Sequence, residues 1–582
     1  MFSLLALVAV AAPVFDLDTV GQRSHYAKTG RVDEVARACE LLQQLGPERA
    51  SCDVIGTTPE GRPLHALTLG RRRPERPTLL VIAGIHAGEI DGKDASFLLM
   101  KELLNAASTK TSTALSGVLN DVTVVFVPVY NVDGHERFRK NHRPNQRGPE
   151  EMGWRVTAQN LNLNRDWTKA DAPETRALLG LMQKIDPVVV VDLHVTDGAQ
   201  FQHDISVIVE PCADDGQNGA LVPVAAALSA SLQTHLKKTG HLPLPFYPSF
   251  ESDDDPSSGF ALGVTPARFT HGYVGHRGRL GVLVETHSWR SSAERVLAVA
   301  DLLRGFFALA HTQARAWQKA VVDVDANAAA LPTKSVPLVW ESDLEKKTVI
   351  DFQGYAYTRE PSTVSGALWT RYDETKKQVW KTPLWAALKV TTTTKAPEAY
   401  AVMPGAAAAV AERLNAHGIQ FSTTTVPLVV PDAETFRATA VTFGAKPYEG
   451  RMTARVKGAW ALSPSTLPVG TLLVPVAQAR GRLIIEMFEP AASESLVGWG
   501  FFNSVFEQKE YMEAYVAEGE ARAMLKKDAA LQEEFNAKLS SDAAFAQDPE
   551  ARLDFFYRRH PAWDEQKDLL PVLRLPHAPR LP

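Results

Sequence analysis

Short apolar runs alternate with helical periodicity over the first half of the chain, from residue 14 to residue 322. The runs are rich in Val, Ile and Leu, which predicts buried strands. Strands that alternate with amphipathic helices are typical of an α/β fold in which helices cover a mainly parallel sheet. The strands predicted by this pattern are residues 78–83, 122–128, 188–193, 205–209 and 280–285.

A helix predicted from residue 291 closes this part of the chain. Ser291 and Glu294 have capping-box spacing, and an apolar stripe follows them at helical intervals. Residues 323–332 are Ala-rich, lack a clear amphipathic stripe and end in Leu-Pro, which predicts a linker. We therefore expect a first domain over residues 13–322.

The remaining residues, 333–582, predict an accessory region of a different kind. Up to about residue 490 the pattern is short strands rich in Thr, Val, Tyr and Trp, interrupted by one helical segment at 407–417. Helical composition returns over residues 493–553. No chemistry is assigned to this region from its sequence.

Composition excludes several classes of protein. A chain of 582 residues is long enough for two to four domains, and its 45% hydrophobic and 22% charged residues are those of a globular protein. The formal net charge of −5 gives no positive field for nucleic acid. Three cysteines are too few for a disulfide framework, so Cys39 and Cys52 are expected as reduced core thiols, although they could pair.

The first residues favour export. Residues 1–12 form a short apolar run that ends in small residues, like a signal peptide, so we expect a secreted or periplasmic protein. The run lacks a preceding Lys or Arg, which leaves a mis-assigned start or an ordinary buried segment as alternatives. No segment has 18 uninterrupted apolar residues, which argues against an integral membrane protein.

Candidate metal ligands lie just beyond the ends of two predicted strands. His86 and Glu89 are three residues apart after the strand at 78–83, although this spacing alone is also compatible with a loop His and a solvated Glu. His194 directly follows a Val-rich strand, at the sheet edge where α/β proteins bind ligands. The competing nearby histidines are His203, His271, His276 and His287.

The order of several segments makes the chain recognisable. Besides the segments that contain His86, Glu89 and His194, they are residues 131–134 (NVDG), 138–141 (FRKN), 161–167 (LNLNRDW) and 281–287 (GVLVETH). Over residues 20–320 the chain resembles the zinc carboxypeptidases of the carboxypeptidase A type, in particular large secreted bacterial members. The resemblance implies an eight-stranded mixed sheet flanked by helices and an enzyme that acts on the C-termini of peptides or proteins.

The resemblance also implies a role for each matching residue. His86, Glu89 and His194 would bind one zinc ion per chain, and Glu285 would be the general base that takes a proton from the zinc-bound water. This metal set leaves a fourth position open for the reactant, as in catalytic zinc sites.

Four further residues are implied around the substrate. Arg139 resembles the residue that stabilises the oxyanion, and Asn164 with Arg165 resembles the pair that holds the terminal carboxylate. Tyr273 is the candidate for the family's mobile tyrosine, with Tyr247 as its rival.

One departure and two rival functions remain. Where many family members have Asp two residues before the Asn-Arg pair, this chain has Asn162, so Asp192 or a backbone carbonyl would have to orient the zinc-bound histidines. The rivals are a zinc amidohydrolase acting on N-acyl amino acids or cell-wall peptides, and a non-catalytic binding protein on the same fold. Residues 251–255, an acidic run, would favour basic C-terminal residues if they lined the specificity pocket.

Overall fold

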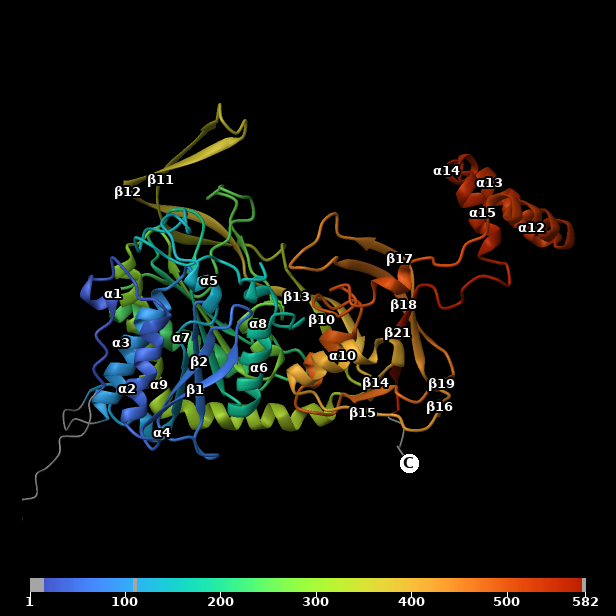
Figure 1. Cartoon of the computed structure of the whole chain (residues 1–582). Coiled ribbons are helices and arrows are strands. Elements are labelled where there is room, and N and C mark those ends of the chain that lie inside the picture. Colours follow the sequence, from blue (N-terminus) through green and yellow to red (C-terminus); the bar gives the residue numbers. More distant parts are fainter. Residues whose placement is uncertain (1–14, 108–112, 578–582) are drawn as a thin grey trace, which may run out of the picture.

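A computed structural model describes residues 15–107 and 113–577 (Figure 1). The first half of the chain folds into an eight-stranded mixed sheet with helices on both faces, which confirms the predicted fold class. The rest is a β-rich region from which a group of helices projects.

The central strands of the large sheet are buried along their whole length. Its strands are β1 (Ala50–Thr57), β2 (Pro63–Leu69), β3 (Thr78–Ala83), β4 (Thr123–Val127), β5 (Val189–Thr196), β6 (Ile205–Glu210), β7 (Pro243–Leu244) and β9 (Leu280–His287). They lie in the order β1-β2-β4-β3-β5-β9-β6-β7. Strands β4, β3, β5 and β9 are parallel neighbours, and their apolar side chains are covered on both faces.

Helices cover this sheet. They are α1 (Val20–Arg23), α2 (Val32–Gln44), α3 (Asp91–Ala106), α4 (Val118–Asp121), α5 (Val132–Glu136), α6 (Pro173–Ile185), α7 (Val222–Lys238), α8 (Thr270–His276) and α9 (Ser292–Asn327). Helices α3 and α7 both contact α9, while α6 lies against β1 and α8 against β9. Because β3 and β5 are parallel neighbours, they end at the same edge of the sheet, and the loops that follow them meet there.

Helix α9 begins as predicted and ends later than predicted. Ser291 caps it, and Glu294 completes the capping box. The expected linker at 323–332 is wrong, because α9 continues to Asn327 and a 3₁₀ turn follows at Ala328–Ala330. Val321, Val324, Ala328 and Leu331 are all buried and follow helical spacing, so core contacts extend the helix through the Ala-rich segment.

The C-terminal region is built mainly from strands. Its strands are β10 (Ser335–Ser342), β11 (Thr348–Pro361), β12 (Leu368–Trp385), β13 (Leu388–Lys395), β14 (Ala399–Val402), β15 (Ser422–Thr423), β16 (Leu428–Val430), β17 (Glu434–Phe443), β18 (Ala454–Leu462), β19 (Ser465–Leu467), β20 (Leu472–Pro475) and β21 (Leu569–Leu575). One further strand, β8 (Phe260–Ala261), comes from the first half of the chain and joins them. Six of them form a sheet in the order β15-β20-β14-β21-β17-β18. Helices α10 (Pro404–His417) and α11 (Gly481–Phe488) also belong to this region.

Two halves of the chain share strands and core. Strand β12 pairs with β8 of the first half, and Phe352 and Trp380 pack with Phe201 and Phe260 in one aromatic cluster. Helix α10 lies against α6, and the Tyr273 hydroxyl donates to Nδ1 of His417 at 2.9 Å. The accessory region is therefore docked on the first half through buried contacts.

The last helices form a projection with its own small core. Helices α12 (Ala514–Lys527), α13 (Ala529–Ser541), α14 (Ala543–Gln547) and α15 (Pro549–Tyr557) extend away from the rest of the molecule in Figure 1. Phe535, Phe545 and Phe555 lie at their centre. Helices were expected from residue 493, but residues 493–513 contain only turns and the 3₁₀ helix Asn503–Phe506, and α12 begins at Ala514. Strand β21 then returns to the six-stranded sheet, which the pattern did not predict.

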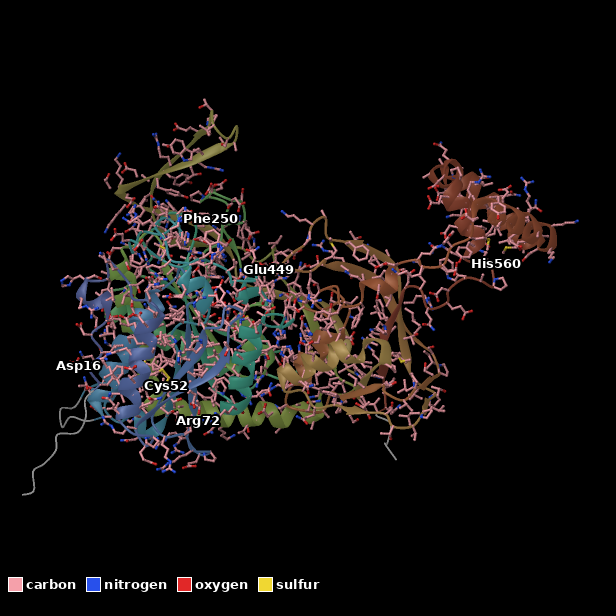
Figure 2. All side chains as sticks on the ribbon, in the orientation of Figure 1. Asp16, Cys52, Arg72, Phe250, Glu449 and His560 are labelled. Atoms are coloured by element: carbon pink, nitrogen blue, oxygen red, sulfur yellow. A yellow bond between two sulfur atoms is a disulfide. The ribbon has the colours of Figure 1, made fainter. Side chains whose placement is uncertain are left out.

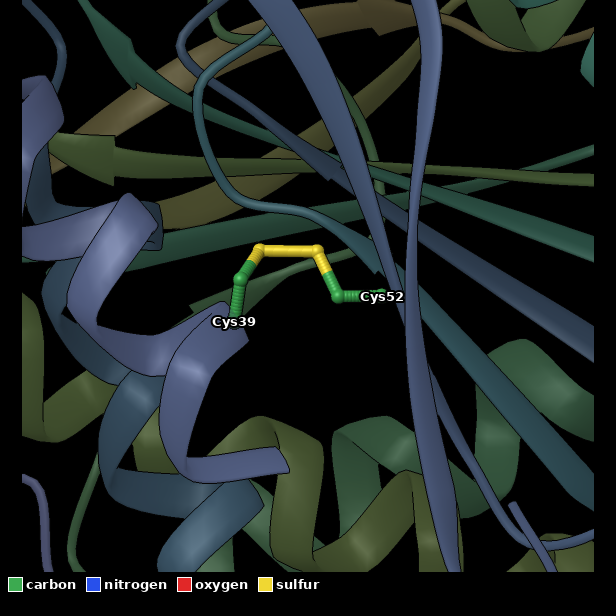
Figure 3. The surroundings of a disulfide bond; sticks show 2 residues. All are labelled: Cys39 and Cys52. Carbon is green, nitrogen blue, oxygen red and sulfur yellow. A yellow bond between two sulfur atoms is a disulfide. The ribbon is translucent and has the colours of Figure 1, made fainter. Parts of the chain in front are cut away.

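Cys39 and Cys52 form a disulfide bond, so the expected reduced thiols are wrong (Figure 3). Cys39 lies on the buried face of α2 and Cys52 on β1, and their Cα atoms are 5.2 Å apart. Because α2 packs directly on β1, the fold brings the two sulfur atoms together.

The predicted signal-like segment at residues 1–12 lies outside the described residues. Within 15–107 and 113–577, none of the helices combines the length and the apolar character needed to cross a bilayer.

Candidate metal centre and active site

The sheet edge formed by β3, β5 and β9 gathers the predicted metal ligands. His86 and Glu89 follow β3 in the loop before α3, and His194 lies near the end of β5. Strand β9 runs parallel to β5 with Glu285 paired in register with His194. Residues that are far apart in the sequence therefore meet because parallel strands end at the same edge.

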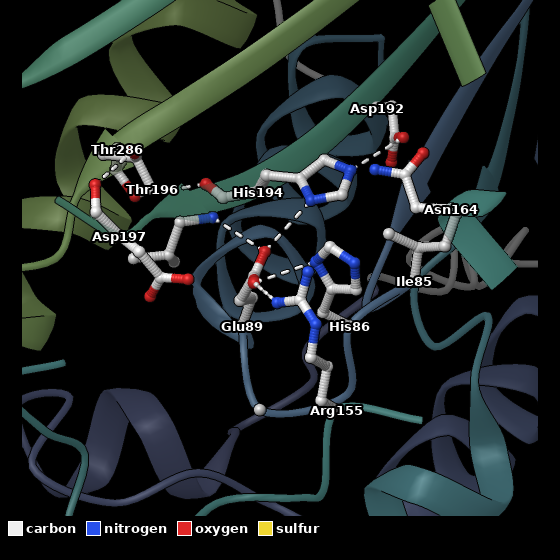
Figure 4. A network of polar contacts seen from close by, with 12 residues as sticks. Ile85, His86, Glu89, Arg155, Asn164, Asp192, His194, Thr196, Asp197 and Thr286 are labelled. Carbon is white, nitrogen blue, oxygen red and sulfur yellow. Dashed lines mark hydrogen bonds and ion pairs between the residues drawn. The ribbon is translucent and has the colours of Figure 1, made fainter. Parts of the chain in front are cut away.

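Glu89 lies between the two histidines (Figure 4). Its Oε1 atom is 2.9 Å from His86 Nδ1, and its Oε2 atom is 3.0 Å from His194 Nδ1. The ligand atoms of the three residues all lie within 4.8 Å of one another, and all three side chains are buried. One carboxylate and two imidazoles, each with Nδ1 turned inward, form a compact N, O, N donor set.

The outer nitrogens of the two histidines have acceptor partners. His194 Nε2 is 2.8 Å from Asp192 Oδ2, and His86 Nε2 is 3.2 Å from Asn162 Oδ1. Asp192 and His194 are two residues apart on one strand, so their side chains lie on the same face. An acceptor at Nε2 holds the proton there and leaves Nδ1 with a free lone pair for a metal. The acceptor beside His86 is thus the neutral amide oxygen of Asn162, and the acceptor beside His194 is the charged carboxylate of Asp192.

Burial and charge set the protonation of these groups. Burial lowers the pKa of His86 to about 4, so its imidazole is neutral at pH 7. Burial opposes ionisation of Glu89, but the neighbouring His86 and Arg143 hold the pKa of Glu89 well below its usual range. For His194, the carboxylate of Asp192 outweighs burial and raises the pKa of the imidazole.

Glu285 is the second carboxylate of the site. Burial, aided by the negative charge of Glu89, raises the pKa of Glu285 to about 8 despite the attraction of His194. Its Oε2 atom has no hydrogen-bond partner among the described residues. Two buried carboxylates and two imidazoles fit a divalent cation such as zinc, whose positive charge would also lower the pKa of Glu285.

The described residues hold one other group with metal-ligand atoms at similar spacing. It consists of Cys39, Cys52 and His65. Both cysteines are bonded in the disulfide, so their sulfur atoms do not offer thiolate ligands.

Arg143, and not Arg139, contacts the metal-ligand cluster. The Arg143 guanidinium is buried and donates to Glu89 Oε1 at 2.7 Å. The Arg139 side chain is exposed, and its backbone pairs with Met152. Both arginines belong to one basic run, and sequence reasoning could not tell which of them turns inward.

The two residues predicted to bind the terminal carboxylate of the substrate, Asn164 and Arg165, lie beside the metal-ligand cluster. Asn164 is buried in the short 3₁₀ turn Leu163–Arg165, and its Oδ1 atom accepts from the Thr270 backbone at 3.3 Å. Arg165 donates from Nη1 to the Asn164 carbonyl at 2.8 Å and stacks on Phe269 at 4.3 Å. The two side chains thus come from one turn, held by α8.

The structure does not bring Tyr273 to the site. Tyr273 is fully buried in α8, where it packs on Trp167 and bonds to His417, so it has no room to move over a substrate. Its rival Tyr247 is 40% exposed and lies 3.1 Å from the Thr196 hydroxyl, next to the end of β5. Burial, together with the charge of Glu285, raises the pKa of the Tyr247 phenol.

The competing histidines have other partners. His203 lies 3.0 Å from the Leu242 carbonyl, His276 2.9 Å from the Gly272 carbonyl and His287 3.0 Å from the Ala199 carbonyl. His271 lies 3.1 Å from the Thr265 hydroxyl. None of the four joins the ligand cluster within the described part of the chain.

A cavity of about 490 Å³ adjoins the site. Tyr247 and His271 line it, together with apolar side chains such as Phe246 and Leu262. Glu210 also lines it, and both oxygens of this buried carboxylate accept backbone N–H groups, from Cys212 at 2.7 Å and Thr265 at 3.2 Å. The acidic run 251–255 does not line this cavity.

Residues 35–241 match the family model described as zinc carboxypeptidase. This part of the chain is similar to the zinc carboxypeptidases. The matched residues include His86, Glu89 and His194 and end before Glu285.

Individual relatives resemble only part of the chain. Mast cell carboxypeptidase A of Mus musculus is 29% identical over 170 residues, which cover 28% of this chain and 39% of the relative. An inactive metallocarboxypeptidase of Saccharomyces cerevisiae is 29% identical over 133 residues, which cover 21% of this chain and 30% of that protein. The chain thus spans well under half the length of these curated relatives. A crystal structure of a metallo-carboxypeptidase from Burkholderia cenocepacia aligns with 48% of this chain and 69% of its own, at 19% identity and a TM-score of 0.36.

Proposed function

We propose that the protein is a zinc metallocarboxypeptidase that hydrolyses the C-terminal peptide bond of peptides or proteins. The observation that carries this proposal is the buried cluster of His86, Glu89 and His194 with Glu285 paired beside it on β9. The match to the zinc carboxypeptidase family model supports the same assignment.

Each residue of the cluster has a chemical task. When bound by His86 Nδ1, Glu89 and His194 Nδ1, one zinc ion per chain supplies a Lewis acid that polarises the scissile carbonyl and makes water easier to deprotonate. Asp192 and Asn162 hold the imidazole rings in the orientation that this requires. Glu285 accepts the proton of the attacking water and returns it to the nitrogen of the leaving amine.

Positively charged residues bind or stabilise the negative groups of the substrate. Arg143 donates a hydrogen bond to Glu89 of the cluster, whereas Arg155 lies farther from Glu89 Oε1, at 3.7 Å. We therefore assign to Arg143 the stabilisation of the developing oxyanion that the family resemblance implies for Arg139. Asn164 and Arg165 bind the terminal carboxylate, which makes the enzyme an exopeptidase. Tyr247 is the tyrosine that can close over the substrate.

The cavity beside Tyr247 is assigned to the side chain of the C-terminal residue. Its apolar lining suits an aliphatic chain, while Glu210 offers a carboxylate that is bonded to backbone N–H groups and to no cation within the described residues. A buried carboxylate without a cation favours a positively charged partner. Peptides ending in Lys or Arg should therefore be cleaved faster than peptides ending in Leu, and Glu210→Gln should reduce this ratio.

The test is the identity of the released product. The enzyme should release the C-terminal amino acid from a free-acid peptide and should fail on the same peptide with an amidated end. Faster hydrolysis of an N-acyl amino acid would favour the amidohydrolase alternative, and binding of the peptide without product would favour the binding-protein alternative. Mass spectrometry of the three reactions distinguishes these outcomes.

Export from the cytoplasm is part of the proposal. The Cys39–Cys52 disulfide supports it, because disulfides persist in oxidising compartments and are rare in the cytosol. Mass spectrometry of the protein recovered outside the cytoplasm should give a chain that lacks about the first 12 residues. Full-length protein confined to the cytoplasm would contradict export.

A further inference from the structure

The hairpin loop at residues 444–453 extends from the C-terminal region to Asn164 and Arg165, the two residues proposed to bind the terminal carboxylate of the substrate. It joins β17 to β18, and Figure 2 shows its residue Glu449 where the two halves of the molecule meet. We propose that Tyr448 of this loop is a positioning residue that fixes the Arg165 guanidinium for the terminal carboxylate of the substrate. This inference rests on the proposed carboxypeptidase function.

The tip of the loop is a tight turn. Tyr448 and Arg451 exchange backbone hydrogen bonds of 2.8 and 3.1 Å. The two residues between them, Glu449 and Gly450, both have positive φ, of 49° and 79°. Two central residues with positive φ are the requirement of a type I′ turn, which makes the tip short and well defined.

Two hydrogen bonds connect this tip to the turn that carries Asn164 and Arg165. Arg165 donates from Nε to the Tyr448 hydroxyl at 3.1 Å. The Asn162 backbone N–H donates to Glu449 Oε2 at 2.9 Å. The loop therefore contacts the side chain of Arg165, directly after Asn164, and the backbone of Asn162, two residues before Asn164.

The hydrogen bonds of Arg165 leave a defined part of its guanidinium for substrate. Nε is bonded to Tyr448, and Nη1 donates one proton to the Asn164 carbonyl. The remaining N–H groups lie on Nη1 and Nη2, at the edge of the guanidinium where a planar carboxylate can accept two hydrogen bonds. Without the Tyr448 hydroxyl the side chain keeps its charge but loses the contact that fixes its rotation about Nε.

The loop itself is anchored on the first half. Arg451 forms a two-point ion pair with Asp171 at 2.7 and 2.6 Å, and it stacks on Phe501 at 3.7 Å. Tyr448 stacks on Trp499 with ring centres 5.9 Å apart. Asp171 lies six residues after Arg165, so the anchor and the clamp belong to the same stretch of chain.

The Tyr448→Phe variant removes the hydroxyl and keeps the ring that stacks on Trp499. Loss of one hydrogen bond to the arginine should raise KM for free-acid peptides roughly three- to tenfold and leave kcat almost unchanged. Tyr515→Phe is the matched control, because Tyr515 is 81% exposed in the helical projection. The melting temperature of both variants checks that the fold is intact.

Two further measurements separate positioning from a structural effect. In an Arg165→Lys background, which has no Nε–H, Tyr448→Phe should add no further rise in KM. Calorimetry with a free-acid peptide and its amide, on a Glu285→Gln protein that does not turn over, should show weaker binding of the acid alone.

Equal KM values for the unmodified enzyme and Tyr448→Phe, with Arg165→Lys still impaired, would overturn the inference and leave the proposed function intact. A rise in KM that persists in the Arg165→Lys background would also overturn it. Absence of any carboxypeptidase activity in the unmodified enzyme would instead contradict the proposed function.

Discussion

At the scale of single residues, Glu89 is the point where the charges of the site meet. It lies within hydrogen-bond distance of His86, His194 and Arg143, and it also accepts from the Val195 backbone at 3.0 Å. Three positively charged or polarisable neighbours and one N–H keep it ionised in a buried position. An ionised carboxylate beside two imidazole nitrogens is a suitable ligand for a divalent metal.

Glu285→Gln tests the separation of metal binding from proton transfer. The amide keeps the size of the side chain but cannot take a proton, so kcat should fall by roughly 10²–10⁴-fold. The zinc content should stay at that of the unmodified enzyme, because the three ligands are untouched. Loss of zinc would make Glu285 a ligand, and a normal kcat with zinc retained would leave the mechanism without its base.

Arg143→Lys and Arg139→Lys form a matched pair from the same basic run. Lysine keeps the charge but loses the planar fork, so Arg143→Lys should lower kcat by about tenfold or more. Arg139 is exposed, and Arg139→Lys should change kcat little. Steady-state kinetics on one free-acid peptide compares the two, and the reverse order of effects would restore the role to Arg139.

Single residues also mark the limit of the sequence as a guide to the site. His86, Glu89 and His194 could be placed together, because each stands just beyond or near the end of a buried strand and strand ends converge, whereas Glu285 was assigned through the family resemblance. Arg143 and Tyr247 could not be selected over Arg139 and Tyr273, because they lie in loops whose direction is set by tertiary contacts.

At the scale of elements, the side chain of His241 connects two parts of the first half of the chain. His241 lies between α7 and β7, with Nδ1 2.6 Å from Asp204 and Nε2 3.1 Å from Asp301 of α9. Hydrogen bonds to Asp204 and Asp301 raise the pKa of His241 to about 9. The charged imidazole thus ties the loop before β7 to α9.

This link predicts a dependence of stability on pH. A pKa raised in the folded state adds stability that is fully present below the unfolded pKa of about 6.5 and is lost as the pH rises through about 9. The difference in melting temperature between the unmodified protein and His241→Gln should therefore be larger at pH 6 than at pH 9.5. A difference that stays constant over this range would show that the charge of His241 does not contribute.

The elements near the site were the most predictable part of the fold. Strands β3, β5 and β9 consist of apolar residues buried on both faces, so their composition alone marks them. The end of α9 was not predictable in this way. Val324 and Ala328 continue the helix through contacts with the rest of the molecule, and such contacts are not visible in an Ala-rich segment.

At the scale of the whole molecule, the two halves do not separate at the predicted boundary. Strand β8 pairs with β12, Phe201 shares a cluster with Phe352, and Asp171 is bonded to Arg413 and Arg451. The order of the six-stranded sheet depends on β21, which joins β14 and β17 from the far end of the chain. Pairing across such a sequence distance leaves no local signal.

The helical projection should be removable without loss of the site. The Asp568 N–H donates to the Val505 carbonyl at 2.9 Å, so the chain leaves and re-enters the β-rich region at nearly the same place. Replacing residues 511–562 by a short Gly/Ser linker should keep kcat/KM and the melting temperature close to those of the full chain. A variant that unfolds or loses activity would show that the projection supports the rest of the molecule.

The most direct measurement of the central claim is stepwise return of zinc to metal-free enzyme while release of the C-terminal amino acid is followed. We expect no release without metal, recovery that is complete at about one zinc per chain, and no recovery for His194→Ala at the same zinc concentration. The amidated peptide should stay intact throughout. Release of the C-terminal residue at the full rate by the metal-free enzyme, or by His194→Ala, would contradict the account.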